Sequence, residues 1–378
     1  MVSSFLVLLV SLLSTGSTYR LSAEQNLELQ ETCGRMRGSF TSGEIDVSRK
    51  FVEGNRASTL EFPWAASVNV EGILTASVIS PRHILLFNII EMDPSNGTLS
   101  IFDDIALTQK AECDVNDLLL PEEVNKYIEV DFVAKQSAVA SPQVAKVIVL
   151  DGCVKIDTFK PMILELAEDL QFDENHRAIC LSDSEDNWNT TEEFSVFGLG
   201  PRGKSLSTAK FAPKECSRKD SLESYVECAK PLNESQGLCA GDFGGGAVAE
   251  INERDVLLGV YAEGNVQCKT DPRKHREPEF INIGHFKDSI CRQTGICVDV
   301  QAFSTTTTTT TVESSKKFTE EGSGDSEETD SFDSEESITA ETYERMKIKE
   351  SSGSSAEDFS AHVKNIHIHI RLDDEQDV

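Results

Sequence analysis

The stretch Cys239-Ala240-Gly241-Asp242-Phe243-Gly244-Gly245-Gly246 is the most informative part of this 378-residue chain. It is a glycine-rich turn that places a carboxylate beside an aromatic side chain. Phe243 has no nucleophilic atom. Glycine-rich turns are common, and the pattern indicates a fold only if other parts of the sequence support it.

Two further stretches supply that support, in a consistent order along the chain. The first is Phe51-Val52-Glu53-Gly54-Asn55-Arg56-Ala57, followed five residues later by Pro63-Trp64 and then by an apolar run from Leu74 to Ile90. The second is Lys160-Pro161-Met162-Ile163-Leu164-Glu165-Leu166. With the glycine-rich turn, these stretches resemble the chymotrypsin- and trypsin-like serine proteases, and more narrowly the secreted trypsin-like group expanded in nematodes. The resemblance covers about residues 51 to 297. It implies an all-β, chymotrypsin-like double β-barrel with a C-terminal helix.

The resemblance also implies that the catalytic residues are substituted. The family's histidine, aspartate and serine positions fall on Ile89, Lys160 and Phe243. Asp157 is close enough to Lys160 to leave the register open, but an aspartate without its histidine and serine has no proton to organise. The two cysteines that normally flank the histidine fall on Leu74 and Ile90, and their joint loss leaves no orphan thiol.

The specificity pocket departs from the trypsin pattern as well. Its base falls on Gly237 and Leu238, so the acidic pocket residue of trypsin is absent. The strand that pairs with substrate falls on Ala262-Glu263-Gly264, where Glu263 is either a charge at the cleft mouth or an exposed loop carboxylate.

The family uses the residue at Asp242 to accept a new amino terminus after cleavage. Here cleavage after Lys50 would expose Phe51, at the family spacing. Two interpretations remain: a cleavage-triggered switch in the binding surface, or an Asp242 that satisfies loop amides in a permanently fixed fold. We favour the second.

Several features predict a secreted chain. Residues 1–17 contain an apolar run followed by small residues, as in a signal peptide, although a buried terminal helix is an alternative. No later segment reaches the ~20 apolar residues of a transmembrane helix. We therefore expect a signal peptide over 1–17, a propeptide-like segment over 18–50 and a trypsin-like domain over 51–297. A tail over 298–361 and a terminal strand within 362–378 complete the expected organisation.

Ten cysteines in a secreted chain predict five disulfides, whose connectivity the sequence alone leaves open. The resemblance implies the pairs Cys239–Cys268, Cys216–Cys228, Cys33–Cys180 and Cys291–Cys297, which leaves Cys113 with Cys153. A zinc site is disfavoured because no Cys-x-x-Cys or His-x-x-x-His spacing occurs. No metal or other cofactor is predicted.

Possible sugar attachment sites agree with secretion. Asn96, Asn189 and Asn233 begin Asn-x-Ser/Thr triplets. Ser323 lies in Glu320-Glu321-Gly322-Ser323-Gly324-Asp325, which resembles a glycosaminoglycan attachment site; a solvated linker is the alternative.

The hydrophobic pattern agrees with the fold. Short β-branched and aromatic runs over Val144–Leu150, Phe194–Phe197 and Val256–Tyr261 predict strands. Residues 284–293 predict the closing helix.

The tail has a different composition. Residues 298–378 contain 20 acidic and 7 basic residues, together with a threonine run over 305–311. Few large apolar residues occur there, so we expect most of the tail to be disordered. The chain's net charge of −30 disfavours nucleic-acid binding, which requires basic surfaces. Near the end, His367 and His369 alternate with isoleucines; we expect a half-buried strand in preference to a His-x-His metal site.

Two classes of function follow, with a third as a further alternative. We expect a secreted, catalytically dead protease homologue that binds extracellular proteins such as proteases or their inhibitors. The first alternative is a serine-type endopeptidase that uses Ser235, Asp242 or a relocated histidine. The second is an extracellular matrix glycoprotein or proteoglycan, supported by the acidic tail.

Overall fold

The computed structural model describes residues 19–35, 55–57, 60–102, 104–132, 141–173, 176–200, 205–218, 222–265 and 276–298. The predicted signal peptide, the Lys50–Phe51 bond, Cys268, the acidic tail from residue 299 and the His367/His369 strand lie outside these residues. The structure therefore describes most of the region that the family resemblance covers, from residue 55 onward.

The first sheet is antiparallel and has the strand order β10-β2-β3-β4-β12-β11-β9-β8. Its strands are β2 (Ala65–Asn69), β3 (Ile73–Ser80), β4 (His83–Phe87), β8 (Glu112–Asp114), β9 (Asp117–Leu119), β10 (Glu129–Phe132), β11 (Val144–Val149) and β12 (Pro161–Leu166). Strands β4 and β12 are buried along their whole length, which is why they read as continuous apolar runs. A small separate sheet contains β5 (Ile90–Met92), β6 (Leu99–Ile101) and β7 (Ile105–Ala106).

The second sheet closes into a six-stranded barrel. Its strands are β14 (Phe194–Gly198), β15 (Ser207–Lys214), β16 (Val226–Pro231), β17 (Gly246–Ile251), β18 (Arg254–Glu263) and β19 (Glu279–Asn282). They follow the order β15-β14-β17-β18-β19-β16, and pairing of β16 with β15 completes the ring. Two short strands add to its margin: β1 (Asn55–Arg56) pairs with β15, and β13 (Cys180–Leu181) runs parallel to β18.

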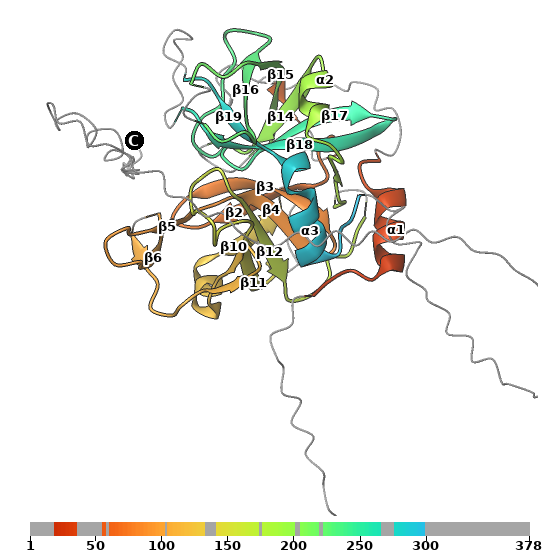
Figure 1. The fold of residues 1–378 in the computed structure, drawn as a ribbon. Helices are drawn as coiled ribbons and strands as arrows, with labels where there is room; N and C mark the ends of the chain where they lie inside the picture. The colour runs from red at the N-terminus through yellow and green to blue at the C-terminus, as the bar shows by residue number, and fades with distance from the viewer. Residues whose placement is uncertain are drawn as a thin grey trace, which may run out of the picture. The chain divides into compact units, whose positions relative to one another are not determined.

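Short helices lie against the two sheets (Figure 1). They are α1 (Ala23–Thr32), α2 (Asp186–Thr190), α3 (Lys287–Thr294) and the 3-10 helices η1 (Glu122–Tyr127) and η4 (Ile283–Phe286). The closing helix predicted over 284–293 is therefore a 3-10 turn that continues into α3. It ends at Gly295, whose φ of 75° suits a left-handed cap. Helix α1 was not predicted, although Ser22 and Gln25 form a capping box at its start.

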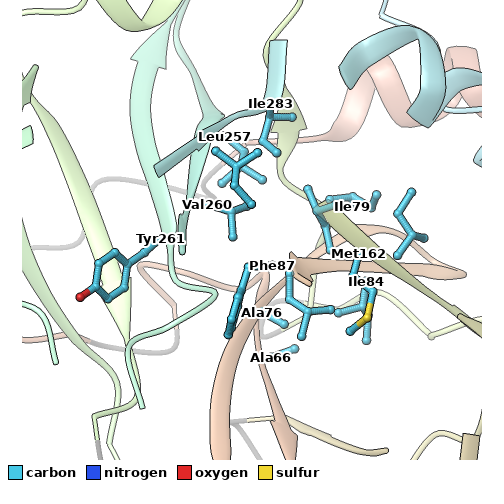
Figure 2. Packing of buried hydrophobic residues seen from close by; sticks show 14 of the residues in the cluster. Ala66, Ala76, Ile79, Ile84, Phe87, Met162, Leu257, Val260, Tyr261 and Ile283 are labelled. Carbon is cyan, nitrogen blue, oxygen red and sulfur yellow. The ribbon is translucent and has the colours of Figure 1, made fainter. Parts of the chain in front are cut away.

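The predicted all-β fold with a C-terminal helix is confirmed. Of the two barrels of the predicted double β-barrel, the second is a closed ring of six strands, whereas the strand pairs described for the first sheet do not close it. The three strands predicted from hydrophobic runs correspond to β11, β14 and β18, each within a few residues. Side chains from both sheets share one apolar core: Figure 2 shows Ile84 and Phe87 of the first beside Leu257 and Val260 of the second. The glycine-rich turn, which begins at Cys239, leads directly into β17 of the second sheet.

Candidate functional site

The glycine-rich turn joins the two barrels through its backbone. The carbonyl of Phe243 accepts the N–H of Thr75 in β3 at 2.9 Å. The Thr75 hydroxyl is fully buried, donates to the Gly241 carbonyl at 2.7 Å and accepts the N–H of Leu199. Gly244 has φ 84°, and a Cβ there would lie 1.9 Å from the Thr75 carbonyl oxygen. Only glycine fits where the backbone of the turn crosses β3 this closely. The hydrogen bonds to Thr75 therefore hold the turn in place, although position 243 carries no serine.

Aromatic packing surrounds Phe243, the residue that the resemblance aligns with the family's nucleophile. The partly buried Phe243 ring stacks on Tyr261 of β18, with ring centroids 4.8 Å apart and an interplanar angle of 1°. On another side it contacts Phe87 of β4, at a centroid distance of 5.9 Å. Tyr261 and Phe87 both belong to the buried cluster of Figure 2. The position is thus part of the apolar core, which stabilises the fold and offers no reacting atom.

Tyr261 directly precedes Ala262-Glu263-Gly264, the segment that the resemblance aligns with the family's substrate-pairing strand. Its side chain is wholly buried, and burial raises the pKa of its hydroxyl well above the ordinary value. A Cβ placed on Gly264 would lie 2.2 Å from the Tyr261 hydroxyl oxygen. The ring therefore extends from Phe243 to Gly264, between the glycine-rich turn and Ala262-Glu263-Gly264. Sequence reasoning missed this residue; the available signal was a large aromatic immediately before the substrate-pairing segment.

A buried amide lies beside Ile89, the residue that the resemblance aligns with the family's histidine. Ile89 is 2 % exposed. The neighbouring Asn88 side chain donates to the carbonyls of Ile90 and Asp157 at 2.8 and 2.9 Å, and accepts the N–H of Ile90. These bonds satisfy the fully buried Asn88 and fix the backbone on both sides of Ile89. Sequence reasoning did not identify Asn88, because a single asparagine carries no periodic signal.

Lys160 contacts aromatic rings. It is 5 % exposed, and its ammonium lies 4.6 Å from the centroid of the Tyr225 ring and 5.7 Å from that of Phe286. This is cation–π geometry. Asp157, the alternative register for this position, accepts the N–H of Phe159 and pairs with Lys155 at 3.1 Å. Neither residue has a histidine at position 89 to orient.

The pocket residues are buried or neutralised. Leu238 is 3 % exposed and Ala262 is 4 % exposed. A small hollow in the second barrel is lined by Phe211, Pro231, Gln236, Gly237, Leu238, Asn265, Arg276 and Pro278. Glu263 is ion-paired with Arg276 and lies 3.7 Å from the guanidinium of Arg218. Its carboxylate is therefore partly buried and paired with two arginines.

Asp242 is fully buried, and its described hydrogen-bond partners are backbone amides. Its two carboxyl oxygens accept the N–H groups of Gly200 at 2.9 Å and Cys239 at 3.0 Å. Burial raises the pKa of Asp242 to about 7, and the two amides oppose that increase. A Cβ on Gly198 would lie 2.3 Å from the carboxyl oxygen, so glycine leaves the room this group needs. Phe51, the other residue of the expected zymogen contact, lies outside the described residues.

Four disulfides are described, and they join the same pairs that the resemblance implies. They are Cys33–Cys180, Cys113–Cys153, Cys216–Cys228 and Cys291–Cys297. Cys239 is also disulfide-bonded, while its expected partner Cys268 lies outside the described residues. The Cys228 sulfur lies close to carboxylate oxygens of Glu277 and Glu279, at a spacing that metal ligands can have. That sulfur is disulfide-bonded to Cys216, so it is not a thiolate ligand.

The other polar candidates are engaged away from Phe243. Ser235 donates its hydroxyl to Asn233 at 2.8 Å in an exposed turn. His176 pairs with Asp173, and His285 pairs with Glu185, each at 3.0 Å. His83 is buried beneath the N-terminal segment. The asparagines of the three glycosylation triplets, Asn96, Asn189 and Asn233, are all exposed, whereas Ser323 lies outside the described residues.

Comparison with known protein families agrees with this architecture. A family model described as the nematode trypsin-6-like family matches residues 3–297. The chain belongs to this family. The match begins far upstream of residue 51, so what the family shares includes the N-terminal segment that carries α1. No curated protein matches the chain significantly.

Family membership does not by itself indicate whether the chain crosses a membrane. Among the helices that the structure describes, none combines the length and apolar character needed to cross a bilayer.

Proposed function

We propose that this member of the trypsin-6-like family is a secreted, catalytically inactive protease homologue that acts by binding extracellular proteins. The observation that carries the proposal is the stacked pair Phe243 and Tyr261. One ring replaces the nucleophile, and the other fills the space beside the substrate-pairing strand. An acyl-transfer site needs a nucleophile, a base and an open position for the substrate. Here Phe243 takes the place of the nucleophile, and Tyr261 fills the position that the substrate would need.

Secretion is supported by the apolar N-terminal run and by the disulfides. Covalent cross-links of this kind persist in oxidising compartments. The exposed positions of Asn96, Asn189 and Asn233 leave each asparagine accessible to glycosylation. A binding role fits a chain that keeps the folded scaffold of a protease while its cleft residues serve the core.

A direct test is covalent labelling of the purified protein with a fluorescent fluorophosphonate, beside active trypsin. We expect trypsin to be labelled and this protein to remain unlabelled, because Phe243 has no hydroxyl. Label that disappears in Ser235→Ala would instead support a serine-type endopeptidase with a non-standard site.

Restoring the triad tests the part played by Tyr261. The triple variant Ile89→His, Lys160→Asp, Phe243→Ser supplies the missing groups, yet we expect no peptidase activity while the Tyr261 ring occupies the substrate space. Adding Tyr261→Val should increase labelling of the introduced serine over that of the triple variant. Near-UV circular dichroism of each variant checks that the barrels remain folded. Full activity of the triple variant would contradict the proposed obstruction.

The binding role is separated from a matrix role by affinity capture from extracellular fluid followed by mass spectrometry. The matched control is a chain truncated after residue 298, which lacks the acidic tail. We expect the truncated chain to retain soluble protein partners, including proteases or their inhibitors. Loss of every partner on truncation, or capture of matrix components alone, would favour the glycoprotein or proteoglycan alternative.

A further inference from the structure

The N-terminal segment contacts both barrels and the end of the C-terminal helix. The Leu21 N–H donates to the Thr294 carbonyl at 2.8 Å. The Asn26 side chain donates to the carbonyl of Cys297 and accepts its N–H, at 2.9 and 3.1 Å. Farther along, the Cys33–Cys180 disulfide joins the segment covalently to the second barrel. Residues 19–34 therefore form a segment that is tethered at its C-terminal end and held by hydrogen bonds elsewhere.

The N-terminal end of this segment covers a buried histidine. His83, at the start of β4, has no exposed surface, and its Nε2 lies 3.2 Å from the Tyr19 carbonyl oxygen. Its Nδ1 lies 2.8 Å from the hydroxyl of the equally buried Ser80. A neutral ring satisfies both contacts if Nε2–H donates to Tyr19 and Ser80 donates to Nδ1. A protonated ring would need the Ser80 oxygen to accept from Nδ1–H with its second lone pair, beside the Arg82 N–H that it already accepts, and the Ser80 O–H would lose its acceptor.

The charged groups around His83 also disfavour its protonation. The Arg82 guanidinium lies 4.5 Å from the centre of the Tyr19 ring and pairs with Asp169 at 3.1 Å. Burial is the largest cause that lowers the pKa of His83 from 6.5 to about 4; Arg82 adds to the effect and the Tyr19 carbonyl opposes it. If the mature chain begins near Thr18, its α-amino group adds another positive charge one residue from Tyr19.

Glu165 is the main group whose protonation has the opposite effect to that of His83 on the covering of His83 by Tyr19. It pairs with His83 across β12 and β4, and burial raises the pKa of its carboxyl. The Tyr19 backbone hydrogen bond, Lys146 and Arg82 oppose this increase. Because the pKa of Glu165 is raised when Tyr19 covers His83, acid favours the covered state through this carboxyl. Because the pKa of His83 is lowered in the same state, acid disfavours it through the imidazole. The Tyr19 N–H donates to the ionised carboxylate of Glu165, and this bond reduces the increase in the Glu165 pKa. We therefore expect the titration of the wholly buried His83 to have the larger effect on the latch.

We propose that residues 19–32 are a latch that neutral His83 holds closed and that acid opens, while the Cys33–Cys180 disulfide keeps the opened segment attached. Opening breaks the hydrogen bonds from Leu21 to Thr294, between Asn26 and Cys297, and from His83 to Tyr19. The closed state is fully favoured above pH 6.5 and weakens as the pH falls toward 4, the window set by the two pKa values of His83.

Hydrogen exchange of the mature, oxidised protein tests the latch. After correction for intrinsic rates, we expect protection of amides in residues 21–32 to fall about tenfold between pH 7 and pH 5. The variant His83→Gln keeps a donor for Tyr19 and an acceptor for Ser80 but does not titrate, so its protection should be independent of pH. Glu165→Gln removes the opposing titration and should enlarge the loss. Amides of β17 and β18 report whether the barrel stays folded.

Two results would overturn the latch. One is equal protection of the wild-type segment at both pH values; the other is an equal loss in His83→Gln. If His83→Gln does not fold, NMR titration of the wild-type imidazole decides: a midpoint near 4 to 5 that coincides with signal changes in residues 19–32 supports the proposal. A midpoint near 6.5 without such changes contradicts it.

Discussion

At the scale of single residues, the buried polar groups beside Phe243 and Ile89 have structural partners. Asp242 binds two backbone amides, Thr75 connects Gly241 to Leu199, and Asn88 holds the loop around Ile89. Each group is completely buried, so losing a partner would leave an unsatisfied polar atom in the core. The substituted site is therefore well ordered, with its hydrogen bonds redirected to backbone.

Asp242 should make stability depend on pH. Its pKa is about 7 in the folded protein, against an ordinary value of 3.8, so the folded state holds a proton that the unfolded state has lost. The unfolding free energy should therefore fall as pH rises from about 4 to 7, by up to about 4 kcal/mol from this group. Urea denaturation at pH 4.5 and 7.5 measures the change.

The matched variant is Asp242→Asn, which cannot ionise. We expect it to lose most of the pH dependence while remaining less stable than wild type at pH 4.5, since its amide group can accept from only one of the two N–H donors. An unchanged slope in the variant would mean that Asp242 does not titrate in this range.

At the scale of elements, the C-terminal helix is anchored to the first barrel by one buried carboxylate. Asp117 of β9 has no exposed surface; its oxygens accept from the Asp151 N–H, the Arg292 guanidinium at 2.7 Å and the Gln293 amide at 2.8 Å. Arg292 and Gln293 both belong to α3. This contact connects the last helix that the structure describes to strands of the N-terminal sheet.

Asp117→Ala should therefore be strongly destabilising. It removes the acceptor of three donors, and we expect a loss of about 3 kcal/mol in the free energy of unfolding. The control is Asp114→Ala, because exposed Asp114 accepts only from Gln293 among the contacts described; a loss below about 1 kcal/mol is expected. Denaturant titration compares the two, and equal losses would contradict a central role for Asp117.

At the scale of the whole molecule, the folded unit extends beyond the boundaries of a mature protease domain. Helix α1 lies upstream of residue 51, yet it contacts Cys297 and is disulfide-bonded to β13. The family match likewise starts at residue 3. The N-terminal segment therefore packs with the barrels in the same way as any other element of the fold.

The folded state should consequently not depend on cleavage after Lys50. We expect N-terminal sequencing of the secreted protein to give a start near Thr18, with no terminus at Phe51 before or after exposure to trypsin-like proteases. The reason is that Asp242 already has two amide partners and does not need a new amino terminus. A Phe51 terminus that appears together with a higher Tm would instead support a cleavage-triggered switch.

The sequence by itself determined the all-β fold class, because strand periodicity and turn residues are local properties. The family resemblance implied the disulfide pairs that the structure describes, while the substitution of the triad at Ile89, Lys160 and Phe243 stays a prediction. Ile89 and Phe243 lack reacting atoms in any conformation. Only the tertiary structure showed that Tyr261 stacks on Phe243, that Asn88 secures Ile89 and that Tyr19 covers His83. These contacts join residues whose encounter depends on how two barrels and a terminal segment pack together, and neither local pattern nor composition encodes which buried surfaces meet.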